Sequence, residues 1–129
     1  MPSSQSPRVV LLTGASGGIG RVMTEALLAA GHSVAAVDRN AAALARLAAQ
    51  HGGAKDRLHP IVADLATAAG CDSAVAEART RFGAIDAVIN NAGIGMSSVR
   101  PDAETRIPGI EELTPEIWDG FLEIGRAHV

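Results

Sequence analysis

The sequence predicts an α/β fold built on a doubly wound parallel sheet. Four short apolar runs alternate with three longer segments in which apolar residues recur at helical spacing. The apolar runs are continuous rather than alternating, as expected for parallel strands that helices cover on both faces. A glycine-rich turn follows the first run and opens the first helical segment. This order of elements is typical of parallel strands joined by crossover helices.

Each predicted strand corresponds to one apolar run. The four runs are Arg8–Thr13, Ser33–Val37, Leu58–Ala63 and Ile85–Asn90. The second strand ends at Asp38 and the third at Asp64, so an acidic residue terminates each of them.

The helical segments have recognisable ends. The first helix begins near Gly18, and Asn40 caps a second helix that runs to about His51. The third helix spans roughly Thr67–Phe82, and Gly83 ends it. On the first helix, the apolar residues expected to face the sheet are Ile19, Val22, Met23, Ala26, Leu27 and Ala30.

The remaining segments are less regular. Met1–Pro7 is rich in serine and proline, and we expect a disordered tail. Residues 94–113 lose both periodicities and are interpreted as a long loop. A fourth helix is predicted to start at Thr114, with Pro115 at its first position. We assign residues 8–123 to one domain.

The composition argues against several functional classes. The 129 residues suffice for one domain, and 47% of them are hydrophobic, which allows a sizeable core. A formal net charge of −3 argues against nucleic acid or an anionic membrane as a partner. No apolar run approaches the length of a membrane span. The single cysteine, Cys71, excludes an internal disulfide, and the four histidines share no metal-ligand spacing. We therefore expect a cytoplasmic protein without a metal site.

The turn from Thr13 to Gly20 has the features of a dinucleotide-binding turn. It lies between an apolar strand and an amphipathic helix, which distinguishes it from a chance cluster of glycines. A side chain at Gly14, Gly18 or Gly20 would block the tight turn, the approach of backbone to a pyrophosphate, or close helix–strand packing. The helix would then point free N–H groups at the bound phosphates. A glycine-rich surface loop is the alternative explanation.

Asp38 is the residue that favours one nicotinamide cofactor over the other. It follows the glycine turn at close to the expected spacing of about 20 residues. A carboxylate there accepts hydrogen bonds from the ribose hydroxyls of NAD and repels the extra phosphate of NADP. Arg39 argues for NADP instead, because a guanidinium can pair with the extra phosphate of that cofactor. We favour NAD because Asp38 lies at the strand tip, and a helix-capping role for Asp38 is compatible with this.

These motifs resemble those of the short-chain dehydrogenase/reductase family. In chain order they are Thr13–Gly20, Asp64-Leu65 and Asn90-Asn91-Ala92-Gly93. The glycines, read as Gly14, Gly17 and Gly20, also fit the related sugar-nucleotide epimerases, but the Asn-Asn-Ala-Gly motif favours the dehydrogenases. The resemblance covers about Arg8 to Leu122. It implies a Rossmann-type sheet with strand order 3-2-1-4, truncated after the fourth strand.

The resemblance also implies roles for individual residues. Those expected along the pyrophosphate and ribose are Ser16, Gly18, Ile19 and Gly20. Those expected beside the adenine are Asp64 and Leu65, although a turn at the strand end also explains Asp64. Those expected to pass beside the cofactor's ribose are Asn91, Ala92 and Gly93. Gly17 stands where NADP-using members often carry a basic residue, which again favours NAD.

The catalytic residues of this family have no counterpart in the chain. The family uses a Tyr as acid/base, a Lys four residues later and a Ser that polarises the substrate oxygen, all after the fourth helix. The chain has no tyrosine, and its only lysine, Lys55, precedes the third strand. We therefore expect hydride transfer with an alcohol or carbonyl only in a longer parent protein, which the resemblance implies to be a homo-oligomer.

Residues 124–129 depart from the family's character. They resemble the in-frame translation of a sequencing adapter, and we interpret them as a non-native tail. A natural short isoform is the alternative origin. For function, the alternative to a dehydrogenase fragment is a non-catalytic dinucleotide-binding module.

Overall fold

The computed structural model describes residues 6–93, 110–112 and 114–120, and it confirms the predicted sheet. Four strands pair in parallel in the order β3-β2-β1-β4. They are β1 (Val9–Thr13), β2 (Ser33–Asp38), β3 (Leu58–Val62) and β4 (Ala87–Ile89). The helices between them are α1 (Gly18–Ala29), α2 (Ala41–Gln50) and α3 (Ala68–Phe82). All of these bounds lie within two residues of the predicted ones.

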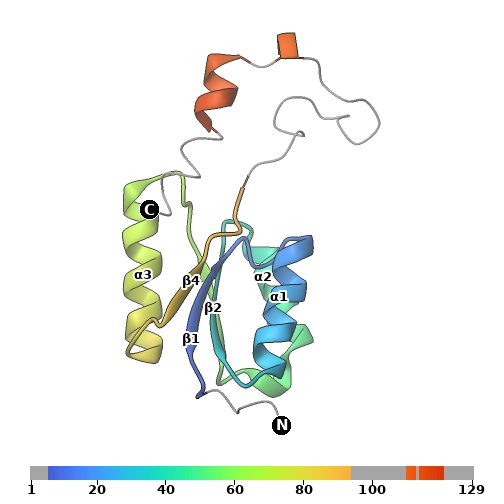
Figure 1. Ribbon diagram of the computed structural model, residues 1–129, viewed down its shortest axis with the longest axis vertical. Helices are drawn as coiled ribbons and strands as arrows, with labels where there is room; N and C mark the ends of the chain where they lie inside the picture. The colour runs from blue at the N-terminus through green and yellow to red at the C-terminus, as the bar shows by residue number, and fades with distance from the viewer. Residues whose placement is uncertain (1–5, 94–109, 113, 121–129) are drawn as a thin grey trace.

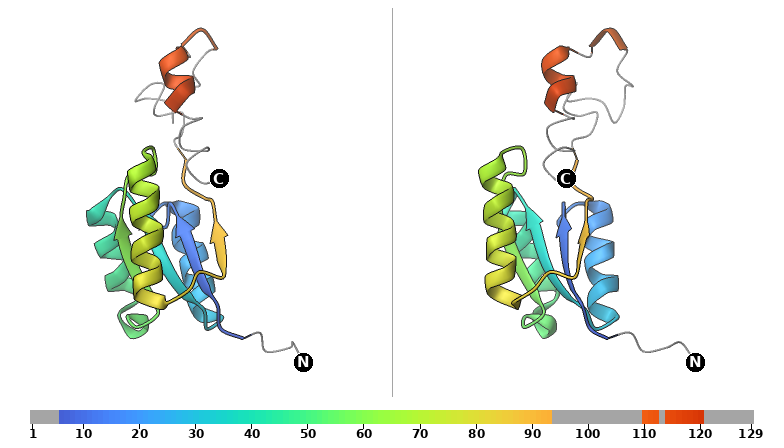
Figure 2. Two further views of the ribbon diagram at one scale, coloured as in Figure 1. Left: turned by 90° about the vertical axis from the view of Figure 1, so that its left-hand side faces the viewer. Right: turned by 60° about the vertical axis from the view of Figure 1, so that its left-hand side comes forward.

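The sheet lies between two layers of helices (Figures 1 and 2). α1 and α2 cover one face, and α3 covers the other. Successive strand residues enter opposite cores, because side chains alternate across a strand. Leu12 packs with Leu28 and Leu44 on the side of α1 and α2, whereas Leu11 packs with Ala74 on the side of α3. This two-sided burial explains why the strand sequences are continuously apolar.

The helix ends form as their capping residues predict. The Asn40 side chain accepts a hydrogen bond from the N–H of Ala43 at 3.0 Å. The Thr67 hydroxyl oxygen accepts one from the N–H of Gly70 at 2.9 Å. Gly83 ends α3 in the left-handed conformation, with a φ of 84°. Each cap satisfies a backbone group that the helix itself leaves unpaired.

The start of the fourth helix is also confirmed. Residues 115–120 are helical, and the Thr114 hydroxyl oxygen accepts a hydrogen bond from the N–H of Ile117 at 3.2 Å. Two short 3-10 segments, Gly52–Ala54 and Ile110–Glu112, complete the described elements.

The buried face of α1 differs from the predicted one. The side chains of Ile19 and Val22 are 69% and 65% exposed, whereas Gly20, Thr24 and Leu28 are buried. Relative to the predicted orientation, α1 is rotated about its own axis, because the bare backbone at Gly20 lies directly against the glycine turn. Burial of Thr24 leaves no unsatisfied polar group, because its hydroxyl donates to the Gly20 carbonyl at 2.8 Å. The predicted face is therefore correct only in part: Met23 and Leu27 are partly buried against the core, whereas the other four predicted residues are exposed.

Three of the sequence-based expectations lie outside the described residues. They are residues 1–5 of the predicted tail over 1–7, residues 94–109 of the predicted loop over 94–113, and the non-native tail at 124–129. Among the described residues, every helix is too short or too polar to span a membrane.

Candidate dinucleotide-binding site

A groove of about 420 Å³ lies at the carboxyl ends of β1, β2 and β4. The chain changes direction here, because β2 and β4 flank β1 and the crossover helices on the two sides cover opposite faces of the sheet. Ligands of open α/β sheets bind at such a point. The groove brings together residues from both glycine-containing motifs and Asp38 at the end of β2. The motif residues are Gly14, Gly17, Gly18, Ile19, Asn91, Ala92 and Gly93. We refer to it as the cofactor groove.

Gly14 holds the ends of β1 and β4 close together. Its φ of 65° is left-handed, a conformation that favours glycine. A Cβ at this position would lie 2.9 Å from the Ala92 Cα and 3.1 Å from the Asn91 side-chain nitrogen. That nitrogen donates to the Gly14 carbonyl at 3.2 Å. A side chain at residue 14 would therefore force the two motifs apart.

Gly20 and Gly18 meet different surroundings. A Cβ at Gly20 would overlap the Gly14 carbonyl oxygen and lie 2.8 Å from the Ala15 Cα. A Cβ at Gly18 would meet nothing within 4 Å, so it would project into open space at the edge of the cofactor groove. Gly20 therefore serves packing of α1 on the turn, and Gly18 keeps the helix start accessible.

The amino end of α1 faces the cofactor groove without a capping side chain. Gly17, in extended conformation, is the N-cap residue and offers no capping side chain to the first turn. The first N–H groups of a helix have no partner within the helix. With Gly18 and Ile19 lining the groove, these donors are available to an anionic group bound there.

The Thr13 hydroxyl organises the Asn-Asn-Ala-Gly segment. Its oxygen accepts hydrogen bonds from the N–H groups of Asn91 and Ala92, each at 3.0 Å. The hydroxyl in turn donates to the Ile89 carbonyl at 3.4 Å. Thr13 is only 2% exposed, so its hydroxyl is shielded from water and is satisfied by these three hydrogen bonds. One side chain thus fixes the path of the chain along one wall of the groove.

Replacing Thr13 by valine is expected to lower the free energy of unfolding by about 1–3 kcal/mol. Valine has nearly the same shape but leaves the N–H groups of Asn91 and Ala92 without an acceptor. Urea denaturation followed by circular dichroism measures the loss. Thr24→Val is the matched control, since the Thr24 hydroxyl only donates to a carbonyl within its own helix. An equal loss in both variants would contradict this role for Thr13.

Asp38 and Ser16 form a hydrogen-bonded pair beside the cofactor groove. The Ser16 hydroxyl donates to Asp38 Oδ2 at 2.6 Å, and the Ser16 N–H donates to the same oxygen at 3.2 Å. The N–H of Asn40 donates to Asp38 Oδ1 at 3.2 Å. An ionised carboxylate offers about four acceptor positions. One position on Oδ1 therefore remains for a ligand hydroxyl while Ser16 keeps its contact.

Arg39, Asp64 and Leu65 do not line the cofactor groove. Arg39 is exposed on the loop after β2. Asp64 accepts a hydrogen bond from the N–H of Ala66 at 3.0 Å, and its carbonyl accepts from Thr67, so its observed contacts are those of a turn. Leu65 is 8% exposed and belongs to the core on the side of α3. The adenine-binding roles of Asp64 and Leu65 stay predictions.

Two structural residues were missed by the sequence reasoning. Thr13 was noted only as part of a motif, although its hydroxyl ties β1 to the segment after β4. Gly70 is the second: a Cβ there would overlap the Asp64 carbonyl oxygen. The signal at Gly70 is a glycine in the first turn of a helix, where its low helix propensity needs a packing reason.

Cys71 and the histidines do not contribute to the groove. Burial, with smaller contributions from the nearby Asp72 and Asp64 carboxylates, raises the pKa of the Cys71 thiol above its usual value, so the thiol is neutral at pH 7. Among the described residues, no three His, Cys, Asp or Glu side chains gather in a way that would hold a metal ion.

Comparisons with known proteins agree with one another. The family model for short chain dehydrogenase matches residues 8–124. The D-threitol dehydrogenase of Mycolicibacterium smegmatis is 36% identical over 117 residues, which are 91% of this chain and 41% of that protein.

Solved structures give the same result. A 3-ketoacyl-(acyl-carrier-protein) reductase from Brucella melitensis, complexed with NADH, superposes with a TM-score of 0.78 at 31% identity, over 94% of this chain and 45% of that one. An L-sorbose reductase from Gluconobacter frateurii, complexed with NADPH and L-sorbose, superposes with a TM-score of 0.78 at 29% identity, over 96% and 44%. The chain spans less than half the length of each of these three proteins.

Proposed function

Because this chain belongs to the short-chain dehydrogenase family, we propose that it is the cofactor-binding part of a nicotinamide-dependent oxidoreductase. The observation that carries the proposal is the cofactor groove. There the bare backbone of Gly14, Gly17 and Gly18 lies opposite Asn91, Ala92 and Gly93, and Asp38 lines the same groove. Two motifs that are more than 70 residues apart in the sequence meet at this one place.

The groups of the groove would bind the parts of a dinucleotide in different ways. The open N–H groups at the start of α1 would receive the pyrophosphate, which can approach because Gly18 has no side chain. The free acceptor position of Asp38 would receive a ribose hydroxyl. We propose NAD as the preferred cofactor, because the Asp38 carboxylate favours an unphosphorylated ribose.

The bound nicotinamide would supply a hydride acceptor or donor. In the oxidising direction, conversion of a secondary alcohol to a carbonyl would also require a base that accepts the proton of the alcohol. This chain has no tyrosine to act as that base. Lys55 precedes β3 and therefore lies toward the amino ends of the strands, away from the groove. We propose that the parent protein supplies the proton-transferring residues, is a cytoplasmic homo-oligomer, and acts on a small alcohol or carbonyl.

A titration of the purified chain with NADH tests this function. We expect saturable binding of one NADH, measured by calorimetry, and no hydride transfer from simple alcohols that scales with protein concentration. Arg79→Gln on α3 is the control, since α3 covers the other face of the sheet. Failure of the folded wild-type chain to bind NADH would contradict the proposal.

A non-catalytic dinucleotide-binding module is the second candidate, favoured by the absence of tyrosine. The reading frame of the source gene downstream of this segment distinguishes the two. A serine followed by Tyr-x-x-x-Lys is expected for the oxidoreductase, whereas a frame without them supports the module. Both candidates share the same NADH-binding groove.

A further inference from the structure

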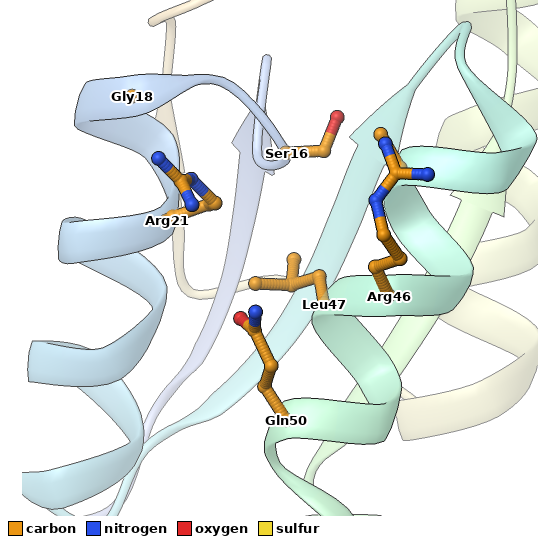
Figure 3. Close-up of a pocket in the computed structure, with 7 residues that line it drawn as sticks. Ser16, Gly18, Arg21, Arg46, Leu47 and Gln50 are labelled. Carbon is orange, nitrogen blue, oxygen red and sulfur yellow. The ribbon is translucent and has the colours of Figure 1, made fainter.

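The Ser16 side chain lies beside the cofactor groove rather than in it. The residues that line the groove include Asp38 but not Ser16. Ser16 instead lines a smaller hollow of about 180 Å³ between α1 and α2. Figure 3 shows its hydroxyl directed away from α1 and toward the side of α2. The hydroxyl is therefore placed to act on Asp38 rather than on a group bound in the groove.

Both donors of Ser16 converge on one oxygen of the Asp38 carboxylate. The Ser16 hydroxyl donates to Asp38 Oδ2 at 2.6 Å, and the Ser16 N–H donates to the same oxygen at 3.2 Å. An O–H···O⁻ bond of this length is charge-assisted and stronger than a hydrogen bond between neutral groups. A carboxylate oxygen has about two acceptor positions. The two donors of Ser16 therefore fill Oδ2.

The other oxygen of Asp38 is held from a different element. Oδ1 accepts a hydrogen bond from the Asn40 N–H at 3.2 Å, which leaves it one acceptor position. Asn40 is itself fixed, because its side chain caps α2 by accepting from the Ala43 N–H at 3.0 Å. The carboxylate is thus held between the glycine turn and the start of α2. Rotation about the side-chain bonds of Asp38 would break these contacts.

We propose that Ser16 is a positioning residue: its hydroxyl occupies Asp38 Oδ2 and so presents Oδ1 to a ribose hydroxyl of the dinucleotide. Ser16 does this without contacting the dinucleotide itself. The inference rests on the proposed function, because it needs a ribose at Asp38. A carboxylate that is already held loses less side-chain entropy when it accepts the ribose hydroxyl, so affinity rises. The Ser16 hydroxyl thereby strengthens the cofactor preference that Asp38 gives.

A double-mutant cycle on the full chain tests this role. Ser16→Ala, Asp38→Ala and their combination are titrated with NADH by calorimetry. Ser16→Ala alone is expected to weaken NADH binding by about 3- to 10-fold, because the carboxylate is no longer held in place. In the Asp38→Ala background the same change should have less than about a twofold effect, because the group through which Ser16 acts is gone.

Ser73→Ala is the matched control for the loss of a hydroxyl. Ser73 is exposed on α3, which covers the other face of the sheet. Its replacement should change NADH binding in neither background. The ratio of NADH to NADPH affinity is the second measurement, because a loss of folding would lower both affinities together. Ser16→Ala should lower this ratio, since a misplaced carboxylate both binds the free ribose less well and repels the extra phosphate less.

Three results would count against these assignments, and they are distinguishable. Equal weakening by Ser16→Ala in both backgrounds would overturn the inference, because Ser16 would then act independently of Asp38. Unchanged NADH binding by Ser16→Ala would overturn it as well. In both cases the wild-type chain still binds NADH, so the proposed function stands. Failure of the folded wild-type chain to bind NADH would instead contradict the proposed function itself.

Discussion

Gly20→Ala is expected to destabilise the protein by about 3 kcal/mol or more. Its Cβ would overlap the Gly14 carbonyl oxygen and crowd the Ala15 Cα at 2.8 Å. Both neighbours are backbone atoms that hold the turn in place, so neither can move aside as a flexible side chain would. Because domains of this kind are stable by only about 5–15 kcal/mol, the loss is a large fraction of the total. Thermal unfolding followed by circular dichroism measures it.

Gly18→Ala is the matched control for this experiment, and it separates folding from binding. No atom lies within 4 Å of the Cβ it would add, and alanine is favoured over glycine in a helix by about 1 kcal/mol. We therefore expect an unchanged or higher melting temperature. The added methyl group would project toward the cofactor groove and weaken NADH binding. A Gly20→Ala protein that melts at the wild-type temperature would contradict the packing role of Gly20.

Asp38→Ala is expected to weaken NADH binding by about 10- to 100-fold and NADPH binding much less. The carboxylate accepts the ribose hydroxyl in the proposed complex, and its removal also removes its repulsion of a nearby phosphate. The preference for NAD should therefore be lost or reversed. Parallel titrations with NADH and NADPH measure the change in preference.

Asp86→Ala controls for the structural part of this effect. Asp86 also uses its carboxylate to hold a backbone N–H, that of Val9, at 2.7 Å. Asp86 lies at the amino end of β4, whereas the cofactor groove lies at the carboxyl ends of the strands. Its loss should lower stability without altering the ratio of NADH to NADPH affinity. An Asp38→Ala protein that keeps the wild-type ratio would show that Asp38 does not select the cofactor.

The elements of this fold were predictable because their signals are local. Continuous apolar runs marked the strands, Asn40 marked a helix start by the hydrogen bond that its own side chain accepts, and Gly83 marked a helix end. The orientation of α1 was predictable only in part, since Met23 and Leu27 pack against the core but Ile19 does not. Gly20, with no side chain to bury, sets which side of the helix meets the sheet, and an apolarity pattern gives weight only to large residues such as Ile19.

The same distinction between local signals and long-range contacts applies to the candidate site. Glycines at fixed spacing and the Asn-Asn-Ala-Gly segment locate the groove, because they are contiguous in sequence. The contact of Thr13 with Asn91 and that of Ser16 with Asp38 depend on how distant segments are set beside each other. Neither leaves a pattern within one stretch of sequence, so both required the three-dimensional structure.

The hydrogen bonds around Thr13 and Gly14 also bear on the thermodynamics of ligand capture. The Thr13 hydroxyl fixes Asn91 and Ala92, and the Gly14 carbonyl accepts from both the Gly17 N–H and the Asn91 side chain. The walls of the groove are thus preorganised before any dinucleotide arrives. Little conformational entropy should be lost from these segments on association, so more of the interaction energy is expressed as affinity.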